Sequence, residues 1–88
     1  MREIAFSTAA FQQYNDWGSE NRKIQKKIIK LIGECQRTPF EGIGKPEALK
    51  HNYKGYWSRR ITDEHRLVYE VTDEMIYISS CKFHYDDD

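Results

Sequence analysis

The spacing of apolar residues changes once along this chain, and that change limits the possible folds more than any other feature. In the first half, apolar residues recur every three or four positions, as in an amphipathic α-helix: Ile24, Ile28, Leu31, Ile32 and Cys35. Thr38-Pro39 ends this pattern, because a residue that precedes proline avoids helical geometry. From Tyr56 onward, short runs of alternating apolar and polar residues are separated by turn residues, which is typical of β-strands. The sequence therefore predicts helices followed by a sheet.

The first half predicts one strand and a pair of helices. Residues 2–6 form the expected strand, and Ser7 supplies the N-cap of a first helix that ends at Gly18. Ser19 then caps the second helix, so that the two helices form an antiparallel hairpin. Residues 40–46 (FEGIGKP) hold two glycines and a proline and are expected to be a loop.

The second half predicts a meander of strands. Strands are expected over residues 56–61, 65–71 and 75–83, and a further short strand is considered over residues 48–53. Together with the first strand this gives a mainly antiparallel, twisted sheet of four to five strands with the helix hairpin packed on it. The expected fold class is α+β, in a single domain that spans residues 1–88.

Charge is balanced over the whole chain but unevenly distributed. Residues 86–88 form an acidic tail of three aspartates, and the other 85 residues carry 14 basic and 11 acidic side chains, a net charge of +3. The basic residues gather in two segments: Arg22, Lys23, Lys26, Lys27 and Lys30, then Lys45, Lys50, Lys54, Arg59, Arg60 and Arg66. Such clusters are expected where the partner is a polyanion, and solvated faces of ordinary elements are the alternative.

Several classes of protein are excluded by composition. The mean hydropathy is −0.86, and no apolar run approaches the roughly 20 residues of a membrane span. Residues 1–7 are too short and polar for a secretory signal, so a cytoplasmic chain is expected. Cys35 and Cys81 are then expected to be reduced packing residues. The widely spaced His51, His65 and His84 match no metal-binding motif, so neither a metal nor another cofactor is expected.

Alternation along two of the strands brings arginines to one face of the sheet. Arg59 and Arg60 must point to opposite faces, and Arg66 lies opposite the apolar face formed by Leu67 and Tyr69. Arg66 and one of the two neighbouring arginines are therefore expected on the face without helices. A basic sheet surface with aromatic neighbours suits a single RNA strand.

RNA can be cut without a metal, because its own 2′-hydroxyl is the nucleophile. The reaction needs a base, cations that hold the developing phosphorane charge, and an acid for the leaving 5′-oxygen. The candidates are Glu47 as base, Arg66 with Lys50 and Arg60 as phosphate holders, His84 as acid, and Tyr85 as an orienting group. Each also has an ordinary interpretation as a solvated surface residue or as the end of an edge strand.

A series of motifs occurs in a characteristic order. They are RTPFEGIGK at residues 37–45, Pro46-Glu47, LKHN at 49–52, WSRRI at 57–61, EHRLVY at 64–69 and CKFHY at 81–85. In these motifs the chain resembles the YoeB family of the RelE/ParE toxin superfamily, over essentially all of residues 1–85. The resemblance implies ribosome-dependent cleavage of mRNA in the A site, with the catalytic residues on Glu47, Arg66, His84 and Tyr85 and supporting cations on Lys50 and Arg60.

The resemblance also implies partners. These are a YefM-like antitoxin, the ribosome with its mRNA, and operator DNA reached only through the antitoxin. A homodimer is expected because the basic helix and exposed aromatic side chains could supply a two-fold interface. Arg59 is kept as a further RNA-binding candidate beside Arg60. The aspartates at 86–88 depart from the family, whose chains typically stop at the His-Tyr pair, and deleting them is expected to leave the cleavage pattern unchanged.

Two other functions remain open at this stage. A ParE-type toxin shares the fold and inhibits gyrase, but such relatives generally lack the counterparts of Glu47 and His84-Tyr85. A catalytically silent RNA-binding module is the second alternative, and it predicts that substitutions at Glu47 and His84 do not relieve growth arrest.

Overall fold

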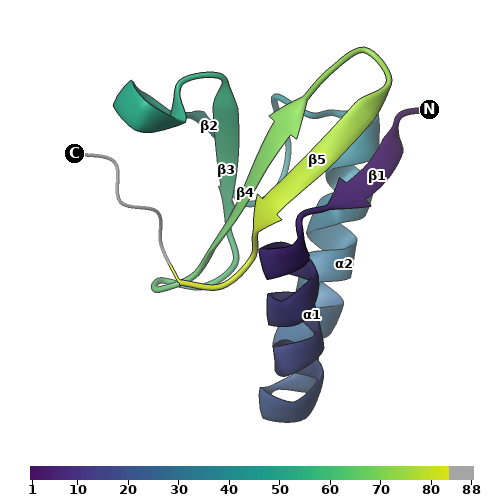
Figure 1. The fold of residues 1–88 in the computed structure, drawn as a ribbon, viewed down its shortest axis with the longest axis vertical. Coiled ribbons are helices and arrows are strands. Elements are labelled where there is room, and N and C mark those ends of the chain that lie inside the picture. The colour runs from purple at the N-terminus through teal and green to yellow at the C-terminus, as the bar shows by residue number, and fades with distance from the viewer. Residues whose placement is uncertain (84–88) are drawn as a thin grey trace.

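The computed structural model describes residues 1–83 and shows two layers, with a pair of helices lying against one face of a sheet (Figure 1). The elements are β1 (Glu3–Phe6), α1 (Thr8–Glu20), α2 (Arg22–Arg37), β2 (Glu47–Ala48), a 3₁₀ helix (His51–Tyr53), β3 (Tyr56–Arg60), β4 (Arg66–Val71) and β5 (Met75–Ser80). The predicted α+β class is confirmed.

The sheet has five strands in the order β1-β5-β4-β3-β2. β1 runs parallel to β5, and every other neighbouring pair is antiparallel, as the sequence predicts for a mainly antiparallel sheet. Two register pairs matter for the site: Glu47 lies opposite Ser58, and Arg60 lies opposite Arg66.

The boundary between the two helices differs from the prediction. α1 does not stop at Gly18, and Ser19 does not cap α2. Asn21 ends α1 and caps α2. Its N–H donates to the Trp17 carbonyl at 2.8 Å, which closes the last turn of α1. Its side-chain oxygen accepts two N–H groups of the first turn of α2 at 3.2 and 3.3 Å. Gly18 lies inside the helix, where an added Cβ would stand 2.8 Å from Nε2 of Gln25, so a larger residue there would require the Gln25 side chain to shift.

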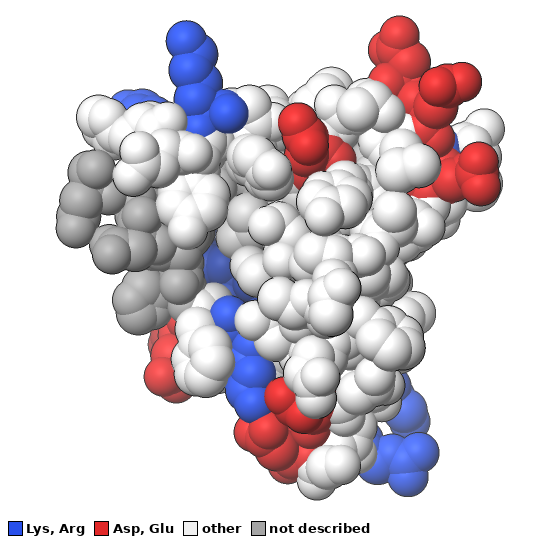
Figure 2. Space-filling model, in the orientation of Figure 1, with Lys and Arg blue, Asp and Glu red and all other residues white. Residues whose placement is uncertain are grey.

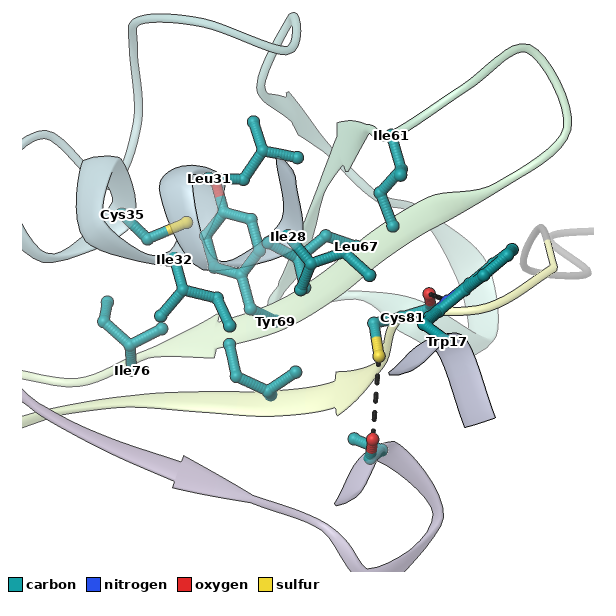
Figure 3. Packing of buried hydrophobic residues seen from close by; sticks show 12 residues of the cluster. Trp17, Ile28, Leu31, Ile32, Cys35, Ile61, Leu67, Tyr69, Ile76 and Cys81 are labelled. Carbon is teal, nitrogen blue, oxygen red and sulfur yellow. Dashed lines mark hydrogen bonds between the residues drawn. The ribbon is translucent and has the colours of Figure 1, made fainter. Parts of the chain in front are cut away.

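The core lies between the helix pair and the sheet (Figure 3). The predicted stripe on α2 faces inward, and Leu67 and Tyr69 of β4 face it, as their alternation predicts. Both cysteines are buried and free, in agreement with the expected packing role. Among the described residues, no helix is both long and apolar enough to span a membrane.

The segment between α2 and β3 is mostly irregular. The predicted loop at 40–46 is confirmed, but the strand considered over residues 48–53 is wrong beyond Ala48. The last strand-like hydrogen bond joins the Leu49 N–H to the Tyr56 carbonyl at 2.9 Å. His51 then adopts a φ of 54°, and the chain closes a 3₁₀ turn in which the Tyr53 N–H donates to the Lys50 carbonyl at 3.0 Å.

Candidate functional site

A small polar cavity of about 150 Å³ is lined by residues of the sheet and of the loop that leads to it: Lys45, Glu47, Ser58, Arg60 and Arg66. The strand registers explain this grouping, because Glu47 faces Ser58 across β2 and β3 while Arg60 faces Arg66 across β3 and β4. A carboxylate and two guanidinium groups therefore share one cavity. Glu47, Arg60 and Arg66 were all predicted as site residues, and the structure brings these three together.

The two arginines of the cavity are held differently. The Arg66 guanidinium donates to the carbonyls of Thr62 at 2.6 Å, His65 at 3.1 Å and Asp63 at 3.2 Å, which fixes it against the turn between β3 and β4. The Arg60 side chain is 45% exposed, and its guanidinium nitrogen lies 3.9 Å from a carboxylate oxygen of Asp63. Arg60 is thus the more adjustable cation, and Arg66 is the preorganised one.

Arg59 does not belong to the site, so its predicted role in RNA binding is wrong. Its side chain is fully buried on the helix side of the sheet. The guanidinium donates to the carbonyls of Thr38, Glu41 at 2.9 Å and Ile43 at 2.9 Å, and its Nε donates to the Tyr69 hydroxyl at 3.1 Å. Loop carbonyls and the Tyr69 hydroxyl therefore occupy the donors with which Arg59 was expected to contact RNA.

The other predicted residues lie outside the cavity or outside the described range. Lys50 is exposed just before the 3₁₀ helix and is not part of the cavity lining. His84 and Tyr85 fall beyond residue 83, the last that the structure describes. The carbonyl of Phe83 accepts the backbone N–H of Arg66 at 3.0 Å, so the described chain reaches the strand of Arg66 one residue before His84.

Sequence reasoning missed two residues of the cavity. Ser58 lies on the same face of β3 as Arg60, so alternation alone could have included it. Lys45 lies in the loop, where no regular spacing of apolar residues predicts which way a side chain points. Its position depends on Gly44, whose carbonyl accepts the Arg60 N–H at 2.6 Å and whose φ of 83° suits glycine.

A larger groove of about 640 Å³ adjoins the cavity and shares Lys45 and Arg60 with it. We call it the lysine groove, and it is lined by Lys23, Lys26, Lys27, Lys30, Leu31, Ile43, Gly44, Lys45 and Arg60. Six of these nine residues are cationic and none is acidic. One group of acidic side chains lies at the corner near the β4–β5 turn and the N-terminus, where Glu3, Asp73 and Glu74 are, and further acidic side chains are spread over the same face (Figure 2).

Three buried groups have raised pKa values. Burial raises the pKa of Tyr69 to about 12 and that of Cys81 to about 12, and it also raises the pKa of Cys35. All three belong to the core and stay protonated at neutral pH. Their part in the site is therefore to support the strands and α2, on which the site is built.

Comparison with known proteins defines the class of this chain. A family model described as "YoeB-like toxin of bacterial type II toxin-antitoxin system" matches residues 6–85. The chain therefore belongs to the class of bacterial toxins of type II toxin–antitoxin systems. Toxin YoeB of Escherichia coli K12 is 52% identical over 83 residues, which cover 94% of this chain and 99% of that protein.

Solved structures agree with this assignment. A YoeB dimer from Staphylococcus aureus has a TM-score of 0.89 at 50% identity, covering 96% of this chain and 98% of that one. The toxin in a heterotetrameric YoeB–YefM complex from the same species has a TM-score of 0.87 at 50% identity, covering 97% and 99%. The chain belongs to the YoeB-like toxin family, and the resemblance noted in its sequence is confirmed.

Proposed function

We propose that this toxin is a ribosome-dependent endoribonuclease that cleaves mRNA in the A site and thereby inhibits translation. One observation carries the proposal: Glu47, Arg60 and Arg66 line a single cavity beside a groove of lysines. A proton acceptor next to fixed cations suits attack by a 2′-hydroxyl on a phosphodiester. The adjoining lysines suit the phosphates on either side of the cut.

The proposed reaction balances without a metal. Glu47 takes the proton of the 2′-hydroxyl, and the 2′-oxygen forms a new bond to phosphorus. The bond between phosphorus and the 5′-oxygen breaks, and His84 gives the leaving oxygen its proton. The products are a 2′,3′-cyclic phosphate, which water can open to a 3′-phosphate, and a 5′-hydroxyl end.

The cations act on the charge that develops at phosphorus. Arg66 is already fixed by three carbonyls, so its charge needs little reorganisation as the phosphorane forms. Arg60, half exposed, can follow the substrate, and Lys50 would hold a neighbouring phosphate. Tyr85 would orient a base or the leaving group.

The ribosome would supply what so small a site lacks. A shallow surface cavity cannot by itself hold an RNA strand in line for attack, and an A-site message is already positioned. The proposed place of action is therefore the cytoplasm. By analogy with the Staphylococcus aureus structures, the proposed protein partners are a YefM-like antitoxin and a second copy of this chain, with operator DNA reached only through the antitoxin.

Primer extension on a translated message tests the proposal. The wild type should produce discrete cuts with 5′-hydroxyl ends. Glu47→Gln keeps the size of the side chain but removes the proton acceptor, so the rate should fall roughly a hundredfold to ten-thousandfold. Glu74→Gln, at the acidic corner away from the cavity, should leave the rate unchanged.

Two results would overturn the proposal. Relaxed plasmid accumulating without cut message would indicate gyrase inhibition instead. Growth arrest that persists in both Glu47→Ala and His84→Ala would indicate a binding module without catalysis. Equal rates on free and ribosome-bound RNA would remove only the ribosome requirement.

A further inference from the structure

The last three described residues, 81–83, are held from two sides although they follow the end of β5. On the α1 side, the Cys81 N–H donates to the side-chain oxygen of Gln13 at 2.7 Å, and the Cys81 carbonyl accepts from Nε1 of Trp17 at 2.9 Å (Figure 3). The Lys82 ammonium lies 2.5 Å from a carboxylate oxygen of Glu20. Side chains on successive turns of α1 thus hold the chain as it leaves the sheet.

On the other side, Phe83 is held by both of its backbone polar groups. Its N–H donates to Nδ1 of His65 at 2.7 Å, and its carbonyl accepts the N–H of Arg66 at 3.0 Å. Phe83 has a φ of 65°, a conformation that a bulky residue adopts at a cost. Phe83 as a whole is 57% exposed, so burial does not account for this conformation. The two backbone hydrogen bonds do.

His65 is itself fixed in orientation and tautomer. Its ring packs edge-on against Trp17, with centroids 4.8 Å apart and an interplanar angle of 87°. Because Nδ1 accepts the Phe83 N–H, the neutral ring carries its proton on Nε2. Nε2 lies 3.7 Å from a carboxylate oxygen of Glu64. Nδ1 of His65, directly before β4, is therefore a hydrogen-bond acceptor whose direction is fixed.

We propose that His65 is a positioning residue for cleavage: its Nδ1 fixes the backbone of Phe83 and so determines where the chain delivers the next residue, His84, relative to Arg66. The inference rests on the proposed function, since His84 is the proposed acid. Arg66 and Phe83 share a backbone hydrogen bond, so a shift of the Phe83 backbone changes the point from which the chain continues to the proposed acid. Errors of about 1 Å in such geometry can cost a hundredfold in rate.

The test uses substitutions that place an acceptor differently. The side-chain oxygen of His65→Asn is as many bonds from the backbone as Nδ1, whereas that of His65→Gln is one bond further away. His65→Leu has no acceptor. All three lose the ring contact with Trp17, so a purely structural role of His65 predicts similar losses of activity in all of them.

Three quantities are measured on each variant: the single-turnover rate of cleavage on programmed ribosomes, the affinity for those ribosomes, and hydrogen exchange at the Phe83 amide. We expect His65→Leu and His65→Gln to cleave roughly tenfold to a hundredfold more slowly, with unchanged ribosome affinity and faster amide exchange. His65→Asn should recover most of the rate and the protection of the amide. Ile32→Val, a core substitution away from this contact, should lower stability and leave the rate unchanged.

The outcomes separate this inference from the proposed function. A wild type that leaves translated mRNA intact overturns both. A wild type that cuts, together with Asn, Gln and Leu variants that cut equally fast or equally slowly, overturns the role of His65 alone. If His65→Leu does not fold, the Asn and Gln variants carry the same comparison.

Discussion

Two adjacent arginines, Arg59 and Arg60, have different surroundings: one is buried in the fold and the other lines the cavity. Arg59 and Arg60 point to opposite faces of β3, as alternation requires. Arg59 is enclosed and bound by carbonyls of the preceding loop, while Arg60 is half exposed in the cavity with Glu47. The same type of side chain therefore holds the loop at position 59 and lines the cavity at position 60.

Removing these arginines one at a time should have opposite effects. Arg59→Met leaves three partly buried carbonyls of the preceding loop without donors, so the free energy of unfolding should fall by about 3 kcal/mol. Arg60→Met should cost less than about 1 kcal/mol, because the side chain is largely solvated, but should slow cleavage roughly a hundredfold. Urea denaturation and single-turnover cleavage measure the two effects. Equal losses of stability in both variants would contradict this division.

The sequence could predict half of this arrangement. Alternation places Arg59 and Arg60 on opposite faces but does not say which of them joins Arg66, and nothing in the period reveals that loop carbonyls converge on Arg59. In the sequence, a buried arginine with no carboxylate in its motif looks the same as an arginine that contacts nucleic acid, because each is a cationic residue on a predicted strand. The path of the loop at 40–46, which depends on tertiary packing, decides between them.

The helix pair shows a similar limit for whole elements. The apolar period located α2, and Ser7 was correctly predicted as the cap of α1. The junction was misplaced because Gly18 and Ser19 have the local signature of a helix end. Hydrogen bonds overrode that signature, because α1 continues through Gly18 and Asn21 ends one helix and caps the next.

The lysine face of α2 predicts an electrostatic effect on RNA binding. Lys26 and Lys30 line the groove that adjoins the cavity, whereas Arg2 and Arg37 do not. The double variant Lys26→Gln with Lys30→Gln should bind single-stranded RNA more weakly. The slope of log Kd against log salt should fall by about 1.4, at roughly 0.7 for each lost phosphate contact.

A matched control separates this groove from net charge. Arg2→Gln with Arg37→Gln removes the same two charges and should change the slope much less. Both double variants are measured with Glu47→Gln in the background, so that the RNA stays intact. Identical slopes for the two double variants would show that total charge, rather than the groove, attracts RNA.

At the scale of the whole molecule, the core connects the helices, the sheet and the loop at 40–46 on which the site is built. Tyr69 illustrates this, since it packs in the core, accepts a hydrogen bond from Arg59 and donates to the Pro39 carbonyl at 2.8 Å. Cys35 of α2 and Cys81 beyond β5 lie in the same cluster. Groups that lose a proton at high pH therefore sit where the helices, the sheet and the loop are joined.

Stability should consequently fall in alkali. The Cys81 thiol has an ordinary pKa of 9.0, raised in the folded protein to about 12, and the pKa of Cys35 is raised too. Because the folded pKa is the higher one, this contribution to stability is complete below about pH 9 and is lost as the pH rises toward 12. In the pH range between its unfolded and folded pKa, each thiol should lower the free energy of unfolding by up to about 1.4 kcal/mol per pH unit.

Urea denaturation in reducing buffer, from about pH 8 to about pH 10, measures that slope. Cys81→Ala should be less stable than the wild type at neutral pH, because it loses buried contacts, yet its stability should fall less steeply with pH. Ile76→Val is the control, since it also weakens the core but removes no titratable group, and its slope should equal that of the wild type. A wild-type free energy of unfolding that stays constant up to pH 10 would mean that the thiols are not held protonated by the fold. A slope that stays steep in Cys81→Ala would assign the effect to Cys35 and Tyr69, which share the junction of α2 with the sheet.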